Sequence, residues 1–205
     1  EEEGGWLAGI LAGMASKTKT VSFVGGMDIP LIHKFACGYI GGAKSLGPDY
    51  KVLEAYTGTT PDAWNDPVKG GEIAKSQFDQ GSDVVYHAAG GTGVGVLQAA
   101  VDAGKLGIGV DSNQNGLHPG KVLTSMVKRV DVAVYDAFMS AKDDKFEPGV
   151  NVFGLKENGV DVAMDENNAP LITPEMKAAV DKARADIISG AVKVHDYMSD
   201  ETCPY

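Results

Sequence analysis

Short apolar runs alternate with longer amphipathic stretches through the first half of the chain. Each run is nearly continuous in apolar character, as in a strand covered on both faces, and is followed by apolar residues at helical spacing. The expected strands are residues 21–25, 51–56, 83–87 and 107–111, and the expected helices between them are residues 30–45, 66–80 and 94–103. This alternation predicts an α/β fold with a parallel sheet and helices on both faces.

After residue 111 the alternation is less regular. A strand is expected at residues 122–127, a helix at about residues 130–141, and an extended pair near residues 150–154 and 160–164. A final helix has clear end signals, with Thr173 as N-cap, Pro174 at the first position and Gly190 at the stop. Another helix is expected ahead of the sheet, over residues 1–16.

The composition narrows the classes of function. The 205 residues are 43% hydrophobic and 22% charged, which is enough apolar material to fill a core without metals or cross-links. A formal net charge of −10 argues against nucleic acid or an anionic membrane surface as a partner. No apolar run reaches the roughly 20 residues that span a bilayer. A neutral or cationic ligand is easier to accommodate.

Glycines and polar residues gather where the expected strands end. In an open α/β sheet, ligands bind outside the carboxyl ends of the strands, where loops converge. The four loops at these ends are residues 25–28, residues 57–60 with Trp64 close behind, residues 89–93 and residues 111–114. They supply glycines for close backbone approach, hydroxyls, amides, a carboxylate and an aromatic plane. This set suits a polyhydroxylated ligand that carries a flat ring.

Four segments, in this order and spacing, resemble the signatures of one family. They read Gly-Gly-Met-Asp-Ile-Pro at 25–30, Ala-Ala-Gly-Gly-Thr-Gly at 88–93, Ile-Gly-Val-Asp-Ser-Asn-Gln at 108–114 and Val-Leu-Thr-Ser-Met-Val-Lys-Arg-Val-Asp at 122–131. The chain is similar to the basic membrane proteins, nucleoside-binding lipoproteins related to PnrA, from about residue 1 to residue 194. Each segment alone is a weak signal, but four in register are specific.

The resemblance implies a type I periplasmic binding fold, in which two α/β lobes joined by a hinge close around the ligand. It implies an extracytoplasmic solute-binding component of an ABC transporter that captures a purine nucleoside (adenosine, guanosine or inosine) and delivers it to the permease subunits. Such a protein is expected to be a monomer in the periplasm or at the outer face of the cytoplasmic membrane, with or without a lipid anchor. It would use no cofactor and catalyse no reaction.

The resemblance also suggests how the chain is divided. Family members carry the first part of an N-terminal lobe before the segment that matches Glu1, so this chain is expected to be the larger part of a longer protein. Residues 1–16 are then a helix from the interrupted first part of that protein. Residues 17–128 form the α/β ligand-binding lobe with its cleft loops. Residues 129–205 comprise hinge-crossing segments, a remnant of the other lobe, and the C-terminal helix and tail.

Asp111 and Lys128 are the first candidate ligand-binding residues. A carboxylate at the end of a strand can accept hydrogen bonds from two neighbouring ribose hydroxyls, and the resemblance also places Asp111 at the ribose. The resemblance assigns Lys128 to a ribose oxygen or a ring acceptor. From the residues alone, Asp111 could instead cap the following turn, and Lys128 could be a solvated surface lysine.

Trp64, Met27 and Pro30 are candidates for the apolar contacts of the ligand. Trp64 follows the second expected strand among loop residues, where its ring could stack on a purine or pack over the end of the sheet. Met27 and Pro30 would line the floor of the cleft, with core packing as the alternative for both.

The loop of Gly91, Thr92 and Gly93 is the candidate for backbone contacts with the ligand, and a tight strand-to-helix turn is its alternative. This loop, with Asp111 about twenty residues further on, also suggests a Rossmann-type oxidoreductase. That reading is weaker, because Val96 stands where the fingerprint needs its third glycine or alanine. A sugar-binding protein of the same fold is a further alternative. A nucleoside-cleaving enzyme would need paired acids, which only Asp28 and Asp111 offer.

Cys37 and Cys203 are the only cysteines and form a candidate disulfide. In an oxidising compartment such a bond would attach the tail to the lobe and stabilise it by about 2–4 kcal/mol. A buried thiol at Cys37 and a free one near the end is the alternative. The four histidines show no metal-ligand spacing, so no metal site is expected.

Overall fold

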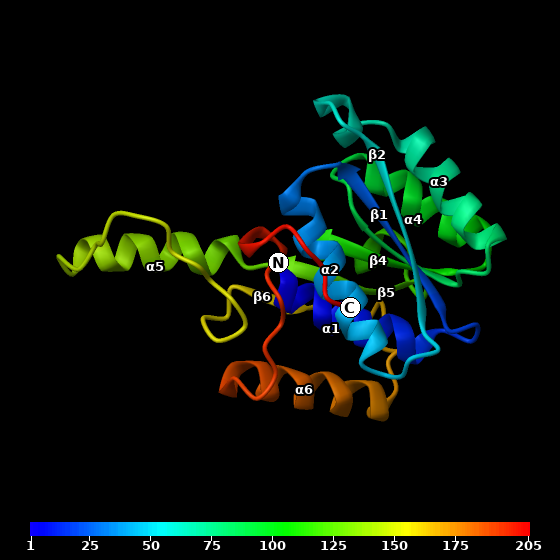
Figure 1. Ribbon diagram of the computed structural model, residues 1–205. Helices are drawn as coiled ribbons and strands as arrows, with labels where there is room; N and C mark the ends of the chain where they lie inside the picture. The colour runs from blue at the N-terminus through cyan, green and yellow to red at the C-terminus, as the bar shows by residue number, and fades with distance from the viewer.

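The computed structural model describes residues 1–205 and contains one six-stranded sheet in the order β2-β1-β3-β4-β5-β6 (Figure 1). The strands are β1 (Thr20–Met27), β2 (Lys51–Gly58), β3 (Val84–Ala88), β4 (Leu106–Asp111), β5 (Val122–Lys128) and β6 (Val160–Val162). The first five are paired in parallel, and β6 pairs antiparallel with β5. The predicted α/β fold is confirmed, and the expected strands of the first half lie within a few residues of their predicted bounds.

Helices cover both faces of this sheet. The chain forms the helices α1 (Glu2–Ala15), α2 (Pro30–Lys44), α3 (Pro67–Asp79), α4 (Thr92–Asp102), α5 (Val130–Lys142) and α6 (Pro174–Ser189), with 3-10 turns η1 (Pro61–Trp64), η2 (Asn115–Leu117) and η3 (Tyr197–Ser199). α1, α2 and α6 pack on one face, and α3 and α4 on the other. None of these helices combines the length and apolar character that a membrane span requires.

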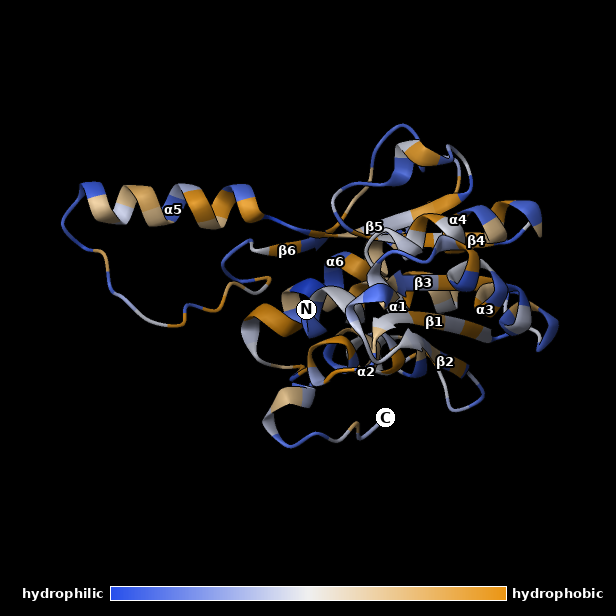
Figure 2. Cartoon of the chain, turned by 90° about the horizontal axis from the view of Figure 1, so that it is seen from above, coloured by the Kyte–Doolittle hydropathy of each residue, from blue (hydrophilic) through white to orange (hydrophobic).

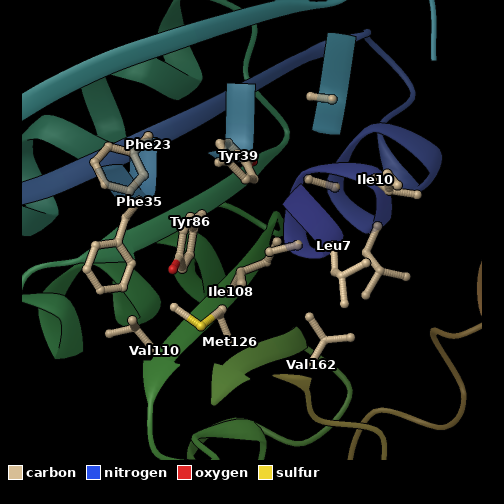
Figure 3. Packing of buried hydrophobic residues seen from close by; sticks show 14 of the residues in the cluster. Leu7, Ile10, Phe23, Phe35, Tyr39, Tyr86, Ile108, Val110, Met126 and Val162 are labelled. Atoms are coloured by element: carbon tan, nitrogen blue, oxygen red, sulfur yellow. The ribbon is translucent and has the colours of Figure 1, made fainter. Parts of the chain in front are cut away.

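Alternate residues of the strands point to opposite faces and fill two apolar clusters. The larger cluster lies under α1, α2 and α6, where the ring of Tyr86 packs 5.4 Å from that of Phe23 and 5.2 Å from that of Tyr39 (Figure 3). The smaller cluster lies under α3 and α4 and includes Val24 and Val85. Both clusters are built from the central strands, so these strands hold the carboxyl edge of the sheet in place.

The backbones of α1 and α2 are in direct contact. A Cβ atom added to Gly9 would lie 2.2 Å from the carbonyl oxygen of Tyr39, and one added to Gly42 would lie 2.0 Å from that of Trp6. The same close approach occurs one helical turn away, at Gly5 and Gly38. Only glycine fits at such contacts. The first turn of α1 is therefore held against the first half of α2.

Residues 129–160 depart from the expected pattern. α5 forms as predicted, but it projects away from the sheet and buries none of its residues (Figures 1 and 2). The extended pair is wrong, because residues 150–154 form no strand and Val160–Val162 pairs with β5 instead. Val150 and Val152 are 96% and 73% exposed, so no neighbouring strand supplies the hydrogen bonds and packing that a strand needs.

The C-terminal segments follow the sequence signals more closely. The Thr173 hydroxyl accepts a hydrogen bond from the Met176 amide, and Gly190 ends α6 with a φ of 79°. The tail then folds back, and Cys203 forms a disulfide with Cys37 of α2, with 5.6 Å between the two Cα atoms. Tyr205 meets Trp6 edge-on at 5.4 Å. The tail is thus attached to both α1 and α2.

Gly9→Ala should destabilise the protein by about 1–3 kcal/mol, because the new Cβ atom would overlap a backbone carbonyl of α2. Urea unfolding followed by circular dichroism measures the effect. Gly13→Ala is the matched control on the same helix, since its Cβ atom would meet the flexible end of the Leu46 side chain. Equal destabilisation by the two substitutions would contradict the importance of the backbone contact.

Candidate ligand-binding site

A hollow of about 200 Å³ lies at the carboxyl ends of β3, β4 and β5. The last residue of each of these strands borders it, namely Ala88, Asp111 and Lys128. The other lining residues are Leu31, Ile32 and Phe35 of α2, Trp64 of η1, Gly90 and Val110. The hollow lies beside the point between β1 and β3 where the strand order reverses, the usual ligand position in an open α/β sheet.

Asp111 and Lys128 face each other across this hollow. The Lys128 Nζ lies 3.4 Å from an Asp111 carboxylate oxygen and 3.2 Å from a carboxylate oxygen of Glu1. It also lies 4.7 Å above the centre of the Phe35 ring, at cation–π distance. The Asp111 side chain is 58% exposed, so its carboxylate is open to a ligand. The two candidates from the sequence are brought together, with Glu1 and Phe35 as further neighbours.

The backbone at Asp111 has an unusual conformation. Its φ is 64°, a left-handed value that few non-glycine residues adopt, and the Ser112 amide donates to the Val110 carbonyl across it at 2.8 Å. Such a tight three-residue turn is strained, and strained residues gather at functional sites. The turn places Asp111 at the rim of the hollow.

A partly buried polar network holds the loop that follows Asp111. The side-chain carbonyl of Gln114 accepts hydrogen bonds from the Val110 amide at 2.9 Å and from the His87 Nε2 at 3.0 Å. The backbone amide of Gln114 donates to the Ser125 hydroxyl at 2.9 Å. Burial lowers the pKa of His87 to about 4, so its ring is neutral and donates from Nε2. The network ties β3, β4 and β5 together behind the hollow.

Trp64 reaches the hollow because two threonines fix the turn that carries it. The hydroxyls of Thr57 and Thr92 both donate to the Ala63 carbonyl, at 2.9 and 2.7 Å, and the Thr92 hydroxyl also accepts from the Asp66 amide at 2.7 Å. The indole packs against the backbone of Gly26. The ring therefore packs over the end of the sheet and also lines the hollow.

The glycine loop contributes a different residue from those predicted. Gly90, with a φ of 55°, borders the hollow, whereas Gly91, Thr92 and Gly93 do not. Thr92 is fully buried, and a Cβ atom on Gly93 would lie 2.0 Å from the His87 ring. Gly91 is exposed beside the Trp64 carbonyl. These residues support the site from behind, and the structure does not bring them to the hollow.

Met27 and Pro30 are also absent from the lining. Pro30 is exposed at the first position of α2, and Met27 is half-buried at the end of β1. The next turns of α2 supply the apolar wall instead, through Leu31, Ile32 and Phe35. The helical spacing of Leu31 and Phe35 is visible in the sequence, but only the orientation of α2 shows that this face borders the hollow.

The remaining acidic and histidine residues do not extend this site. Asp28, considered above as an acid partner of Asp111, does not line the hollow and lies 2.7 Å from the Nε2 of His33. No three histidine, cysteine or acidic side chains lie together in a way that could hold a metal ion.

Comparison with known proteins places this geometry in context. The model of the family described as ABC transporter substrate-binding protein PnrA-like matches residues 1–197. The ABC transporter nucleoside-binding protein BmpA of Lactococcus lactis is 40% identical over 212 residues, covering 95% of this chain and 58% of that protein. An uncharacterized lipoprotein of Pyrococcus abyssi is 40% identical over 173 residues, covering 78% of this chain and 42% of that protein. The chain thus spans about half the length of these relatives.

A solved structure supports the same assignment. A solute-binding protein of an ABC transporter system from Aeropyrum pernix superposes with a TM-score of 0.81 at 27% identity, covering 96% of this chain and 65% of that one. The expected type I periplasmic binding fold is therefore confirmed.

The stability of the protein should fall as the pH decreases from about 6.5 to about 4. The unfolded chain binds a proton at His87 with a pKa near 6.5, whereas the folded protein does so only near 4. The unfolded state therefore gains protons first, which costs up to about 3 kcal/mol of unfolding free energy. Urea unfolding at pH 7 and pH 4.5 measures this loss.

His87→Gln should reduce this pH dependence, because it removes the buried imidazole that causes it. An unchanged pH dependence in His87→Gln would show that His87 does not cause it.

Proposed function

The chain belongs to the PnrA-like family of ABC transporter substrate-binding proteins, and we propose that it forms most of a component that captures a purine nucleoside and delivers it to an ABC permease. The observation that carries the proposal is the meeting of Trp64, Asp111 and Lys128 at one hollow. The nucleoside-binding relative from Lactococcus lactis supports this class of ligand. The role is capture without chemical conversion, in keeping with a family of substrate-binding proteins.

The lining of the hollow suits the two halves of a nucleoside. The Asp111 carboxylate can accept hydrogen bonds from two ribose hydroxyls, and the Lys128 ammonium can donate to a ribose or ring oxygen. Trp64 offers an aromatic surface for the base, next to apolar residues of α2. One cation against two carboxylates disfavours a phosphorylated ligand, since an anion would be repelled.

The small size of the hollow supports the proposal that another lobe supplies a second wall of the binding site. Pockets for drug-sized ligands usually enclose about 300–1,000 Å³, and this hollow of about 200 Å³ is smaller and open on one side. The chain covers only 58% of its Lactococcus relative. We assign residues 17–128 to the ligand-binding lobe, with residues 1–16 entering it and residues 129–205 holding the hinge crossings, the remnant of the other lobe, and the C-terminal helix and tail.

α5 supports this assignment. A hollow of about 380 Å³ next to it is lined only by apolar side chains, which are Val134, Ala137, Phe138, Ala141 and Phe146. Phe138 is 72% exposed and Phe146 56% exposed. An apolar helix face needs a partner surface in water. We propose that the rest of the second lobe supplies it, so that α5 moves with that lobe when the cleft closes around the ligand.

The proposed location is the periplasm or the outer face of the cytoplasmic membrane. The Cys37–Cys203 disulfide supports an oxidising compartment. A lipid anchor is proposed by analogy with the lipoprotein from Pyrococcus abyssi. The closed form of a monomer would then be what the permease recognises.

Isothermal titration of the full-length protein, with both lobes, tests the proposal. Adenosine, guanosine, inosine, cytidine, ribose and NAD form the panel. We expect a purine nucleoside to bind with a Kd of about 1 μM or tighter, without turnover. Binding of NAD alone would favour an oxidoreductase, binding of ribose alone would favour a sugar-binding protein, and release of free base would indicate a nucleoside-cleaving enzyme.

Asp111→Ala should weaken nucleoside binding at least about tenfold, or about 1.4 kcal/mol, because the ribose hydroxyls would lose their acceptor in the closed cleft. Asp111→Asn keeps one acceptor oxygen and should bind with intermediate affinity. Asp79→Ala, at the exposed end of α3, is the control and should bind like the unaltered protein. Unchanged affinity in Asp111→Ala would remove this residue from the site.

A further inference from the structure

A chain of alternating charges runs from the C-terminal tail into the hollow. Its side chains, in order, are those of Asp196, Lys34, Glu2 with Glu1, Lys128 and Asp111, and the α-amino group of Glu1 also pairs with Glu2 at 3.1 Å. Asp196 precedes η3 in the tail, Lys34 is on α2, and the two glutamates begin α1. The Lys34 and Lys128 side chains are only 11% and 29% exposed, so water screens these contacts less than it screens surface ion pairs.

Among these charged residues, Glu1 pairs with Lys128 rather than with Lys34. The Lys34 ammonium lies 3.1 Å from Asp196 and 3.2 Å from Glu2, whereas it is 3.9 Å from Glu1. The carboxylate of Glu1 lies closer to Lys128, at 3.2 Å. Two other carboxylates thus satisfy Lys34, and Glu1 is the stronger partner of Lys128.

The position of Lys128 between two carboxylates matters for the ligand. Lys128 is 3.2 Å from Glu1 and 3.4 Å from Asp111, and the Phe35 ring below it holds the ammonium at this intermediate place. Without Glu1, the ammonium would pair fully with Asp111, and the ion pair would occupy the oxygens that a ligand's hydroxyls need. A ligand would then have to break that pair before it could bind.

We propose that Glu1 is a positioning residue that acts through Lys128 and keeps the Asp111 carboxylate free to accept hydroxyl groups of the ligand. This inference rests on the proposed function, since it concerns the same hollow. Glu1 itself does not line the hollow. Its effect on a ligand therefore depends on the ammonium of Lys128.

Glu1→Gln in the full-length protein tests the inference, with the tightest-binding purine nucleoside of the panel as the probe. We expect the Kd to rise about fivefold, the size of one partly buried ion pair. Glu72→Gln is the matched control, because it makes the same change of charge at an exposed position of α3. The control should bind like the unaltered protein. Urea unfolding of both variants separates a binding effect from a loss of stability.

A double-mutant cycle separates positioning from a structural role. Lys128→Gln removes the charge but keeps a hydrogen-bond donor, so binding should stay measurable. In that background Glu1→Gln should change the Kd less than about twofold, because its route to the ligand has been removed. An equal loss in both backgrounds, or a Glu1→Gln affinity equal to that of Glu72→Gln, would overturn the inference while nucleoside binding stands. Absence of nucleoside binding in the unaltered protein would overturn the proposed function, and this role of Glu1 with it.

Discussion

The backbone contact between α1 and α2 is the constraint on which the site depends. Glycines on both helices let the main chains touch, so that the first turn of α1 lies against α2 with little freedom to shift. That contact places Glu1 beside Lys128 and Glu2 beside Lys34. It also orients α2, whose Phe35 borders the hollow and holds the ammonium of Lys128. α1, which is mostly a buried core helix, therefore also determines where charged residues lie at the carboxyl edge of the sheet.

The sheet supplies the other half of the arrangement. Parallel strands end at one edge, so the last residues of β3, β4 and β5 meet there without any special sequence requirement. What is special is the polar support behind them. Gln114 connects Val110 with His87, and Ser125 joins the network from β5. Because these groups are bonded to one another, the strained turn at Asp111 cannot relax without breaking several hydrogen bonds.

Much of the lobe could be predicted from the sequence, because its strands and helices follow local hydrophobic periods. Asp111 and Trp64 could be proposed as candidates for a related reason, since each lies at or just after the end of a strand, whereas the candidate role of Lys128 came from the family resemblance. Phe35 was missed because a buried aromatic residue on a helix reads as core. Whether Gly90 or Gly91 borders the hollow depends on the backbone angles of the turn, which the residue types do not determine.

The other misses have a long-range origin. The contact of Glu1 with Lys128 joins residues that lie far apart in the sequence, and no local pattern encodes it. The strand expected at residues 150–154 failed because a strand needs a neighbour, and β6 already occupies the free side of β5. The pairing of Cys37 with Cys203 stayed one of two alternatives until the fold showed the tail lying on α2.

Lys128 connects the candidate site to α5. It is the last residue of β5, and α5 begins two residues later, at Val130. The Arg129 amide donates to the Gly159 carbonyl at 2.8 Å, and the Leu155 amide donates to the Glu3 carboxylate at 2.6 Å. The first turn of α1, the end of β5 and the returning loop thus meet at one place. Under the proposed function, a ligand that bonds to Lys128 would act at this junction, and binding would then be coupled through it to the orientation of α5.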